Sequence, residues 1–493
     1  MKKIVIAGSG NAALSAGIAA LESGASVLIL EKADKALAGG NTKYTAGAMR
    51  FAYENADDLI PLLADPTDPR LQKTDFGAYT EAKFREDLLG FNDGQPVSEE
   101  QQALLTESLD AVHWLASHNI KFEPIYSRQS FEKDGRFVFW GGLTMAARNE
   151  GVGLFELELA EFERLGGSIR YQAGVTDLIV ENGTVTGVKL GNEEVMADAV
   201  ILGCGGFEAN NDLRVENMGA HWSAAKVRGT PHNTGDGLRI AASLGAMRYG
   251  NYGGCHATPM DLHMENFGNL NLPPKERKKY RKICYFLGIM LNAEGKRFVD
   301  EGKNFRNYTY AQFGRAVLEQ PGHFAWQVFD SKITDLLYDE YFFEHASFVE
   351  ADTLEDLVKM MKGVDTEQAM RTIAEFNSSV NENQPFDPTI LDSKNTEELA
   401  LPKSNWAQKF DSPPYRAYPV TGGITFTYGG LKVDKTGCVL REDASPISGL
   451  YACGELVGGV FFGGYPGGSG LTSGTVFGRR AGRGAAVGGH APS

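Results

Sequence analysis

The sequence predicts an α/β fold, a doubly wound parallel sheet whose domain is interrupted by a second domain of mixed α and β structure. Its first 31 residues run as apolar stretch, glycine turn, Ala-rich stretch and second apolar stretch, which is the order strand, turn, helix, strand. Glycine-rich turns return near residues 203 and 467. Between them, residues 257–410 have fewer glycines and more charge, which indicates an inserted domain within a first domain of 1–256 and 411–493.

The first turn predicts a dinucleotide site. Residues 3–7 form an apolar strand that leads into Gly8-Ser-Gly10-Asn-Ala-Ala13. Gly8 permits a tight turn, Gly10 lets backbone amides approach a pyrophosphate, and Ala13 keeps the helix close to the sheet. The positive N-terminus of that helix favours an anion. Glu31 follows the second strand, where an acid about 20 residues on binds a ribose hydroxyl.

The rest of the first domain follows in alternating pieces. The expected elements are helices at 103–117 and 154–165, strands at 168–171, 176–181, 184–190 and 197–202, and a helix that starts near Asp236. Asn182-Gly183 is typical of a two-residue hairpin turn. A β-hairpin is therefore expected as an insertion in the doubly wound sheet.

Charge and cysteine content exclude several classes of protein. A net charge of −15 argues against nucleic-acid binding, which needs a basic surface to neutralise phosphates. The one basic cluster, 275–282, is expected to be a solvated helix face. The five cysteines are odd in number and show no C-x-x-C spacing, so they indicate neither a disulfide framework nor a metal site.

The N-terminus is not expected to be a leader, because the glycine turn interrupts its apolar run after Ala7. No stretch reaches the roughly 18 apolar residues of a membrane span. We therefore expect a protein of the reducing cytoplasm.

The motifs together resemble the flavoproteins of the fumarate reductase, urocanate reductase and 3-ketosteroid dehydrogenase group. The segments that carry this resemblance lie at 8–10, 31, 39–42, 233–237, 294–301, 454–455 and 467–474, in the order of that family. Residues 306–310 and 423–428 look most like the tricarballylate dehydrogenase branch. The resemblance implies a Rossmann-like FAD-binding domain, a capping domain, FAD, and hydride transfer at a carbon–carbon bond beside a carbonyl or carboxylate.

The same resemblance implies which residues hold FAD. They are Gly8, Gly10, Asn11, Ala12, Glu31, Lys32, Gly40, Asn41, Thr42, Gly47, Val175, Gly205, Asp236, Gly454, Glu455, Gly470, Leu471 and Thr472. The amides of Leu471 and Thr472, at a helix start, would stabilise negative charge on the reduced flavin. Glu455 suits the ribityl hydroxyls. The segment 39–47 contains no histidine for a covalent link, so noncovalent FAD is expected.

The substrate residues depart from the family. His256 resembles a substrate-binding histidine, and Arg306 resembles the arginine that donates the proton. One extra residue between Glu301 and Arg306 leaves Tyr308 as a rival. Phe426 and Tyr465 stand where fumarate reductases have a second histidine and a second arginine.

Tyr465 looks like the tyrosine that polarises a ketone in ketosteroid dehydrogenases. A substrate with one carboxylate, or a ketone, fits these residues better than a dicarboxylate, because an unpaired buried carboxylate is costly.

We therefore expect an FAD-dependent oxidoreductase acting on a CH–CH bond of a small organic substrate, with Arg306, Tyr465, His256 and Tyr308 as candidate catalytic residues. A ketosteroid-type desaturase of a bulky ketone and a non-catalytic FAD-bound scaffold remain alternatives. No second nucleotide-binding unit for NAD(P)H follows the first, so a separate electron donor or acceptor is expected. The direction of the reaction and the oligomeric state stay open.

Overall fold

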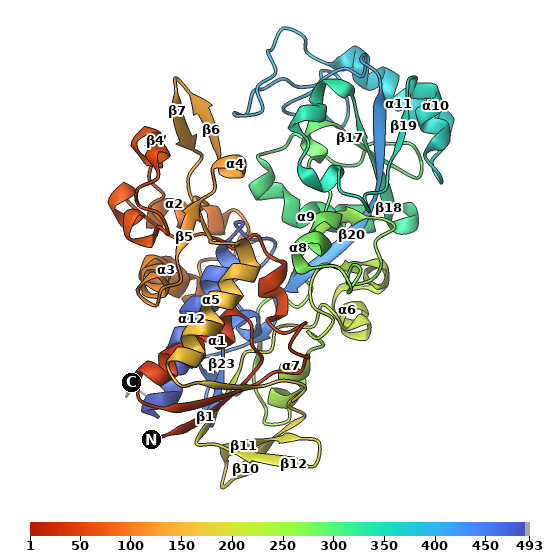
Figure 1. The fold of residues 1–493 in the computed structure, drawn as a ribbon. Coiled ribbons are helices and arrows are strands. Elements are labelled where there is room, and N and C mark those ends of the chain that lie inside the picture. The colour runs from red at the N-terminus through yellow and green to blue at the C-terminus, as the bar shows by residue number, and fades with distance from the viewer. Residues whose placement is uncertain (489–493) are drawn as a thin grey trace. The chain divides into compact units, whose positions relative to one another are not determined.

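The computed structural model describes residues 1–488, which divide into two compact units (Figure 1). Unit 1 comprises 1–218, 229–255 and the chain from 426 onward, and unit 2 comprises 219–228 and 256–425. Unit 2 thus contains the whole expected insertion, 257–410, and extends beyond it on both sides. The extension at 219–228 arises because its short strand β14 (Lys226–Val227) pairs in parallel with the long strand β20 (Tyr415–Thr427).

The main sheet of unit 1 has six strands in the order β22-β23-β13-β1-β2-β9. Their bounds are β22 (Cys438–Leu440), β23 (Pro446–Ala452), β13 (Ala199–Leu202), β1 (Lys3–Ala7), β2 (Ser26–Leu30) and β9 (Ser168–Arg170). Strand β1 lies between β13 and β2, and Ile6 is opposite both Ile201 and Ile29 in parallel register. Every residue of β13 and all but Lys3 of β1 are buried. Uninterrupted apolar strands are typical of a parallel sheet covered on both faces, and the doubly wound fold is confirmed.

Two helices that lie far apart in the sequence pack closely against each other in unit 1. They are α1 (Asn11–Glu22) and α12 (Ser469–Val487), with α5 (Glu150–Arg164) beside α1 (Figure 1). A Cβ on Gly478 would lie 2.5 Å from the carbonyl oxygen of Ala12, and one on Gly482 would lie 2.2 Å from that of Ala16. The glycines of α12 therefore let the last helix of the chain approach the first helix.

The helix expected at 103–117 begins earlier, as α3 (Glu99–Ser117). Its start is set by a capping box, in which Ser98 Oγ accepts from the Gln101 amide at 2.9 Å and Gln101 Oε1 accepts from the Ser98 amide at 3.2 Å. The helix expected at 154–165 likewise starts earlier, at Glu150. The first turn of α3 is polar and that of α5 is mostly glutamate and glycine, so neither contributes to an apolar period.

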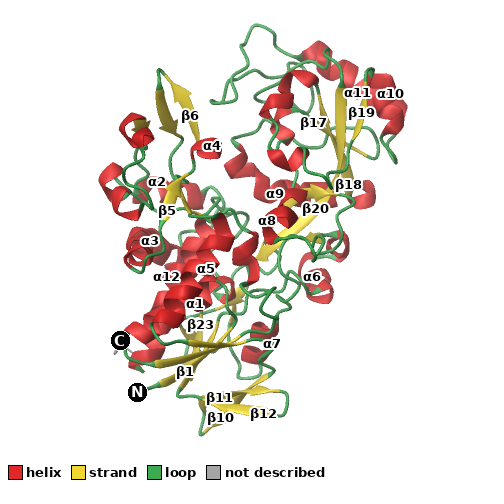
Figure 2. Cartoon of the chain, viewed as in Figure 1, coloured by secondary structure: helices red, strands yellow, loops and turns green. Residues whose placement is uncertain are grey.

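The hairpin insertion forms a small sheet of its own. Strands β10 (Asp177–Glu181) and β11 (Thr184–Leu190) are antiparallel, and β12 (Glu193–Met196) adds a third strand (Figure 2). Asn182 and Gly183 have φ angles of 51° and 79°, which are the positive values that a type I′ turn requires. The predicted turn is confirmed, and the insertion has one strand more than expected.

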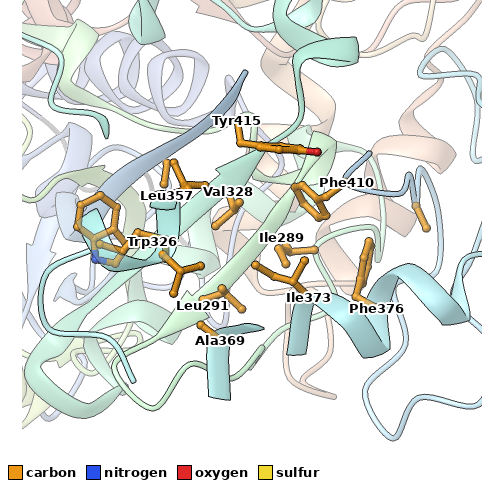
Figure 3. Packing of buried hydrophobic residues seen from close by; sticks show 14 of the residues in the cluster. Ile289, Leu291, Trp326, Val328, Leu357, Ala369, Ile373, Phe376, Phe410 and Tyr415 are labelled. Atoms are coloured by element: carbon orange, nitrogen blue, oxygen red, sulfur yellow. The ribbon is translucent and has the colours of Figure 1, made fainter. Parts of the chain in front are cut away.

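Unit 2 is built on β20. The sheet order is β14-β20-β18-β17, and β16 and β19 also pair with β20. The bounds are β16 (Cys255–Asp261), β17 (Ile289–Asn292), β18 (Phe324–Phe329) and β19 (Val349–Ala351), with helices α8 (Pro274–Arg277), α9 (Arg306–Leu318), α10 (Leu354–Met360) and α11 (Thr366–Ser379). Figure 3 shows one face of this sheet packed against α11, where Ile289 and Val328 meet Ile373 and Phe376 in a buried cluster.

The remaining helices and strands of unit 1 are shorter. They are β3 (Ala48–Met49), β4 (Thr74–Asp75), α2 (Glu81–Leu89), β5 (Phe122–Pro124), α4 (Tyr126–Gln129), β6 (Ser130–Lys133), β7 (Arg136–Phe139), β8 (Met145–Ala147), α6 (Asn211–Met218), α7 (Asp236–Ala242), β15 (Arg248–Tyr249) and β21 (Gly430–Leu431). The helix that begins at Asp236 was expected. Across residues 1–488, no helix combines the length and the apolar character that a membrane span needs.

Candidate functional site

The glycine turn joins β1 to α1 at the edge where the parallel strands end. Gly8 has φ +99°, and a Cβ on it would lie 2.5 Å from the carbonyl oxygen of Gly203. Gly10 has an ordinary backbone, and its Cβ would meet Thr42 Oγ1 only at 3.5 Å. Gly8 is therefore required by the protein itself, whereas the space beside Gly10 remains open for a ligand. Asn11 follows at the start of α1, and its amide donates to Thr42 Oγ1 at 2.9 Å.

Glu31 lies at the end of β2, next to this turn. Its Oε2 accepts from Ser9 Oγ at 2.5 Å, and its Oε1 accepts from the Ala33 amide at 2.7 Å. Lys32 Nζ donates to Asp236 Oδ2 at 2.8 Å, although both side chains are partly exposed. The structure thus brings Glu31, Lys32 and Asp236 to one edge of the sheet, and Glu31 has the position after the second strand where an acid can bind a ribose hydroxyl.

The second glycine segment forms a short 3-10 turn at 40–44. Asn41 Nδ2 donates to Glu208 Oε1 at 2.7 Å, and its Oδ1 accepts from the Thr230 amide at 2.9 Å. Gly40 and Gly47 both have positive φ, and a Cβ on Gly47 would lie 2.5 Å from the backbone of α5. These glycines let the backbone of this segment adopt positive φ and approach α5 closely.

The start of α12 lies next to the start of α1. Asn11 Nδ2 donates to the Leu471 carbonyl oxygen at 2.8 Å, which links the starts of the two helices. Glu455 Oε1 accepts from the amide of Thr427 at 2.6 Å and from its hydroxyl at 2.9 Å. Helix α12 follows Gly468, which has no side chain to cap the first amides, so Gly470, Leu471 and Thr472 lie on an uncapped first turn.

The other predicted cofactor residues lie around the same edge or near it. Gly205 has φ +74°, and a Cβ on it would lie 2.3 Å from Asn233 Nδ2. Gly454 also has positive φ, and a Cβ on it would lie 2.6 Å from the Cβ of Ala12. Val175 is half-buried in the loop between β9 and β10.

These residues fit FAD. The residues that precede α1 and α12 are Gly10 and Gly468, which have no side chain to cap the helix, so the amides that follow Asn11 and Ser469 would be available to a diphosphate and to an anionic flavin ring. The carboxylate oxygens of Glu31 and Glu455 are of the type that would accept from ribose and ribityl hydroxyls. When bound, FAD supplies the chemistry of hydride transfer.

Tyr465 belongs to an aromatic cluster in unit 1. Its ring meets Phe426 at 5.1 Å and 86° and Phe461 at 5.3 Å and 71°, and Tyr428 packs on the last two. Tyr465 is 7% exposed, so its ring is surrounded mainly by these aromatic side chains. The two residues that replace the family's charged anchors therefore lie in contact, edge to face.

His256 is buried in unit 2. Its ring meets that of Tyr310 on α9 at 5.0 Å and 71°, edge to face. Burial holds the pKa of His256 well below its usual range, and the positive charges of Arg228 and Arg281 lower it further. The imidazole is therefore neutral near pH 7 and donates or accepts hydrogen bonds without carrying charge.

Arg306 is the first residue of α9, and its guanidinium lies 5.1 Å from the ring of Tyr338. Tyr310 follows one helical turn later and therefore shares its face. Tyr308 lies two residues on and points away from that face. Glu301 forms its ion pair with Arg297, at 2.5 Å.

The sequence interpretation of 275–282 was wrong. Arg277, Lys278, Arg281 and Lys282 are buried rather than solvated. Arg281 pairs with Glu340 at 2.5 Å, and Lys282 Nζ donates to the Glu340 carbonyl oxygen at 3.0 Å. Burial lowers the pKa of Lys282 to about 8. The partner Glu340 lies nearly 60 residues further along the chain, and only the fold brings it here.

Arg228 and Arg281 were missed as site residues. Arg228 is buried directly after β14, its amide donates to the Ile424 carbonyl oxygen at 2.8 Å, and its Nη1 donates to Thr425 Oγ1 at 3.2 Å. A single arginine after a two-residue strand gives no pattern to detect. The apolar residues that follow Arg281, from Ile283 onward, were the one signal that this stretch is buried.

Comparison with known proteins places this geometry in a family. Residues 3–471 match the family described as FAD binding domain. The chain is 28% identical to the fumarate reductase (cytochrome) of Shewanella frigidimarina over 98% of its length and 76% of that protein. It is also 28% identical to the 3-oxosteroid 1-dehydrogenase of Mycobacterium tuberculosis over 66% of its length and 62% of that protein.

Among solved structures, the 3-ketosteroid Δ1-dehydrogenase of Sterolibacterium denitrificans has the same fold. It superposes with a TM-score of 0.73 at 21% identity and covers 99% of this chain and 100% of that one. FAD is thus the cofactor, and the expected class, an FAD-dependent oxidoreductase acting on CH–CH bonds, is confirmed. The chain belongs to the FAD binding domain family.

Proposed function

We propose that this protein transfers a hydride between FAD and the CH–CH group of a small organic substrate, beside a carboxylate. The observation that carries the proposal is the cationic surroundings of His256 in unit 2. Arg228 and Arg281 lie close enough to His256 to lower its pKa. Tyr310 on α9 contacts the His256 ring, and Arg306 lies on the same face of α9 as Tyr310. Positive groups gathered around a buried polar residue attract an anionic substrate group.

The proposed roles follow from charge and position. Neutral His256 orients the carboxylate by a hydrogen bond, and Arg228 balances its charge. Arg306 transfers the proton at the carbon next to the one that exchanges the hydride. The shared face of Arg306 and Tyr310 supports Arg306 over Tyr308 for this step.

Arginine is almost always protonated, which suits a proton donor and hence reduction of a C=C bond. In the dehydrogenation direction Arg306 would pass the proton on through a relay. The proposal covers both directions, because hydride and proton move together as one pair in either.

A ketone as the activating group is the second candidate. Tyr465 lies in the aromatic cluster with Phe426 and Phe461, where an unpaired carboxylate would be costly to bury. A phenol hydroxyl can instead polarise a carbonyl oxygen and stabilise the enolate that forms. A bulky cyclic ketone, as in a ketosteroid-type desaturase, would make use of this apolar surface.

We also propose a separate electron donor or acceptor, since the sequence has one nucleotide-binding turn of this kind. The relatives' names include a fumarate reductase (cytochrome) and an NADH:acrylate oxidoreductase, so partners differ among similar proteins.

Anaerobic flavin spectroscopy tests the proposal. A panel of saturated acids and ketones is scored by bleaching of oxidised FAD, and the matching unsaturated compounds are scored by reoxidation of reduced FAD. We expect turnover to fall by roughly 10²-fold or more in Arg306→Ala, the usual scale for a lost acid or base, and to change little in Tyr308→Phe. Reversed effects would assign the proton to Tyr308.

Arg228→Gln separates the two substrate classes. It should raise KM for carboxylate substrates and leave ketone substrates unaffected, because only the former have a charge to balance. A flavin that no compound of the panel bleaches or reoxidises would instead support the non-catalytic scaffold.

A further inference from the structure

Glu208 is a fully buried carboxyl group in unit 1, in the loop after β13. Its Oε1 accepts two hydrogen bonds, one from Asn41 Nδ2 and one from Asn233 Nδ2, both at 2.7 Å. Both donors are neutral amides. The two asparagines therefore satisfy one oxygen of Glu208 without compensating a negative charge.

The second oxygen of Glu208, Oε2, is buried and has no hydrogen-bond partner among the described residues. The neighbouring acid is Glu455, whose negative charge raises the pKa of Glu208 and whose Oε1 is held by the amide and hydroxyl of Thr427. Glu455 packs against the loop that carries Glu208 because residue 206 is glycine, where a Cβ would lie 2.1 Å from Glu455 Oε1. An unpaired buried carboxylate oxygen is costly, whereas a protonated one can donate to a neighbouring carboxylate.

The surroundings decide which carboxyl group holds the proton. Burial and the negative charge of Glu455 hold the pKa of Glu208 well above its usual range, whereas the hydrogen bonds from Thr427 oppose the rise that burial causes in the pKa of Glu455. Arg214 also lies against this loop, where it donates to the backbone carbonyl oxygen of Glu208 at 2.6 Å.

We propose that Glu208 is a neutral carboxylic acid that donates its proton in a hydrogen bond to the Glu455 carboxylate, and that it is the positioning residue which aims Glu455 at FAD. Glu455 then accepts from Thr427 on one oxygen and keeps capacity for the hydroxyls of the cofactor. The pair carries one negative charge instead of two. The inference concerns unit 1 and does not depend on the substrate.

The sign of the pH dependence follows. The pKa of Glu208 in the folded protein is raised, so the stability that the neutral form contributes is complete below the pKa of a free glutamate, near about 4.3. It is lost as the pH rises through the folded value. Ionised Glu208 repels Glu455 and turns it away, so FAD binding weakens on the alkaline side.

A glutamine at position 208 reproduces the neutral acid. Its amide oxygen can accept from Asn41 and Asn233, and its amide nitrogen can donate to Glu455, but it cannot ionise. Glu208→Gln should therefore bind FAD as the wild type does at acidic pH and should keep that affinity on the alkaline side, where the affinity of the wild type falls. Glu208→Leu should lose FAD at both pH values, because it leaves both asparagine donors unsatisfied.

Glu158 offers a matched control. It is also fully buried in unit 1, Ser15 Oγ donates to its Oε1 at 3.0 Å, and burial raises its pKa well above the usual range. It lies on α5 and makes no contact of this kind with Glu455. Glu158→Gln should thus leave the pH dependence of FAD affinity as in the wild type.

The test measures FAD affinity by flavin fluorescence between about pH 6 and pH 9 for wild type and the three variants, with circular dichroism to establish folding. Infrared difference spectra between holoprotein variants supply a second readout, the C=O stretch of protonated carboxylic acids, from which Glu208→Gln should remove one component and Glu158→Gln a different one. The proposal is overturned by a loss of about tenfold or more in the affinity of Glu208→Gln at every pH. It is equally overturned by an unchanged alkaline loss in that variant, or by an acid C=O band that has the same intensity in Glu208→Gln as in the wild type.

Discussion

The two glycines of the first turn should respond to substitution in opposite ways. Gly8→Ala places a Cβ 2.5 Å from the Gly203 carbonyl oxygen on a backbone with φ +99°. Gly10→Val places its Cβ 3.5 Å from Thr42 Oγ1 on a backbone with φ −72°. The first change acts on the protein, and the second acts on the space that the diphosphate needs.

The expected magnitudes follow from that geometry. A left-handed backbone costs a non-glycine residue roughly 1–2 kcal/mol, and the overpacking at Gly203 adds about 1–3 kcal/mol. Gly8→Ala should thus lower the free energy of unfolding by about 2–5 kcal/mol, a large share of a stability of about 5–15 kcal/mol. For Gly10→Val we expect a stability change within about 1 kcal/mol, but a loss of FAD affinity of at least tenfold, or about 1.4 kcal/mol.

Chemical denaturation of the FAD-free protein measures the first quantity, and flavin fluorescence titration measures the second. Each variant is the control for the other, because Gly8→Ala should lower the stability of the protein and Gly10→Val should lower its affinity for FAD. If Gly10→Val retained FAD with wild-type affinity, the pyrophosphate would not lie at this turn. If Gly8→Ala were as stable as the wild type, the contact with Gly203 would not constrain the fold.

Two further predictions concern the flavin and its neighbour. Acid or heat precipitation should release all of the yellow colour, because residues 39–47 contain no histidine for a covalent bond; flavin that remains in the washed pellet would contradict this. Tyr465→Phe should lower the rate of hydride transfer with ketone substrates more than it weakens their binding, since the lost hydrogen bond, about 0.5–1.5 kcal/mol in the ground state, strengthens as enolate charge develops. Stopped-flow flavin reduction separates rate from affinity, and an unchanged rate would make Tyr465 a packing residue.

Much of unit 1 was predictable because its signals are local. The order strand, glycine turn, helix, strand and acid lies within 31 residues, and each step has its own physical reason in that stretch. The Asn182-Gly183 turn is likewise decided by two adjacent residues that adopt positive φ. The placement of residues 454–474 beside Asn11 was expected only through resemblance to a family.

The third strand of the inserted sheet was not expected. Strand β12 has four residues, of which three are exposed and none is buried, so its pairing with β11 carries little sequence signal. The early starts of α3 and α5 were missed for a related reason, because their first residues do not continue the repeat of apolar residues from which the helices were predicted.

The sequence by itself determined that residues 3–13 form a dinucleotide-binding turn and that glycine-rich backbone recurs where a cofactor must approach. Only the tertiary structure decided which charges are buried and what faces them. From the sequence, Arg281 and Lys282 belong to a basic stretch that is expected to be solvated, but in the fold they are buried and bind Glu340. Glu208 has no distinguishing signal in the sequence, and only the fold brings Glu455 to the loop of Glu208, at Gly206. Burial and pairing of charges depend on residues distant in the chain, and the free energy of each charge is set by those neighbours rather than by its own type.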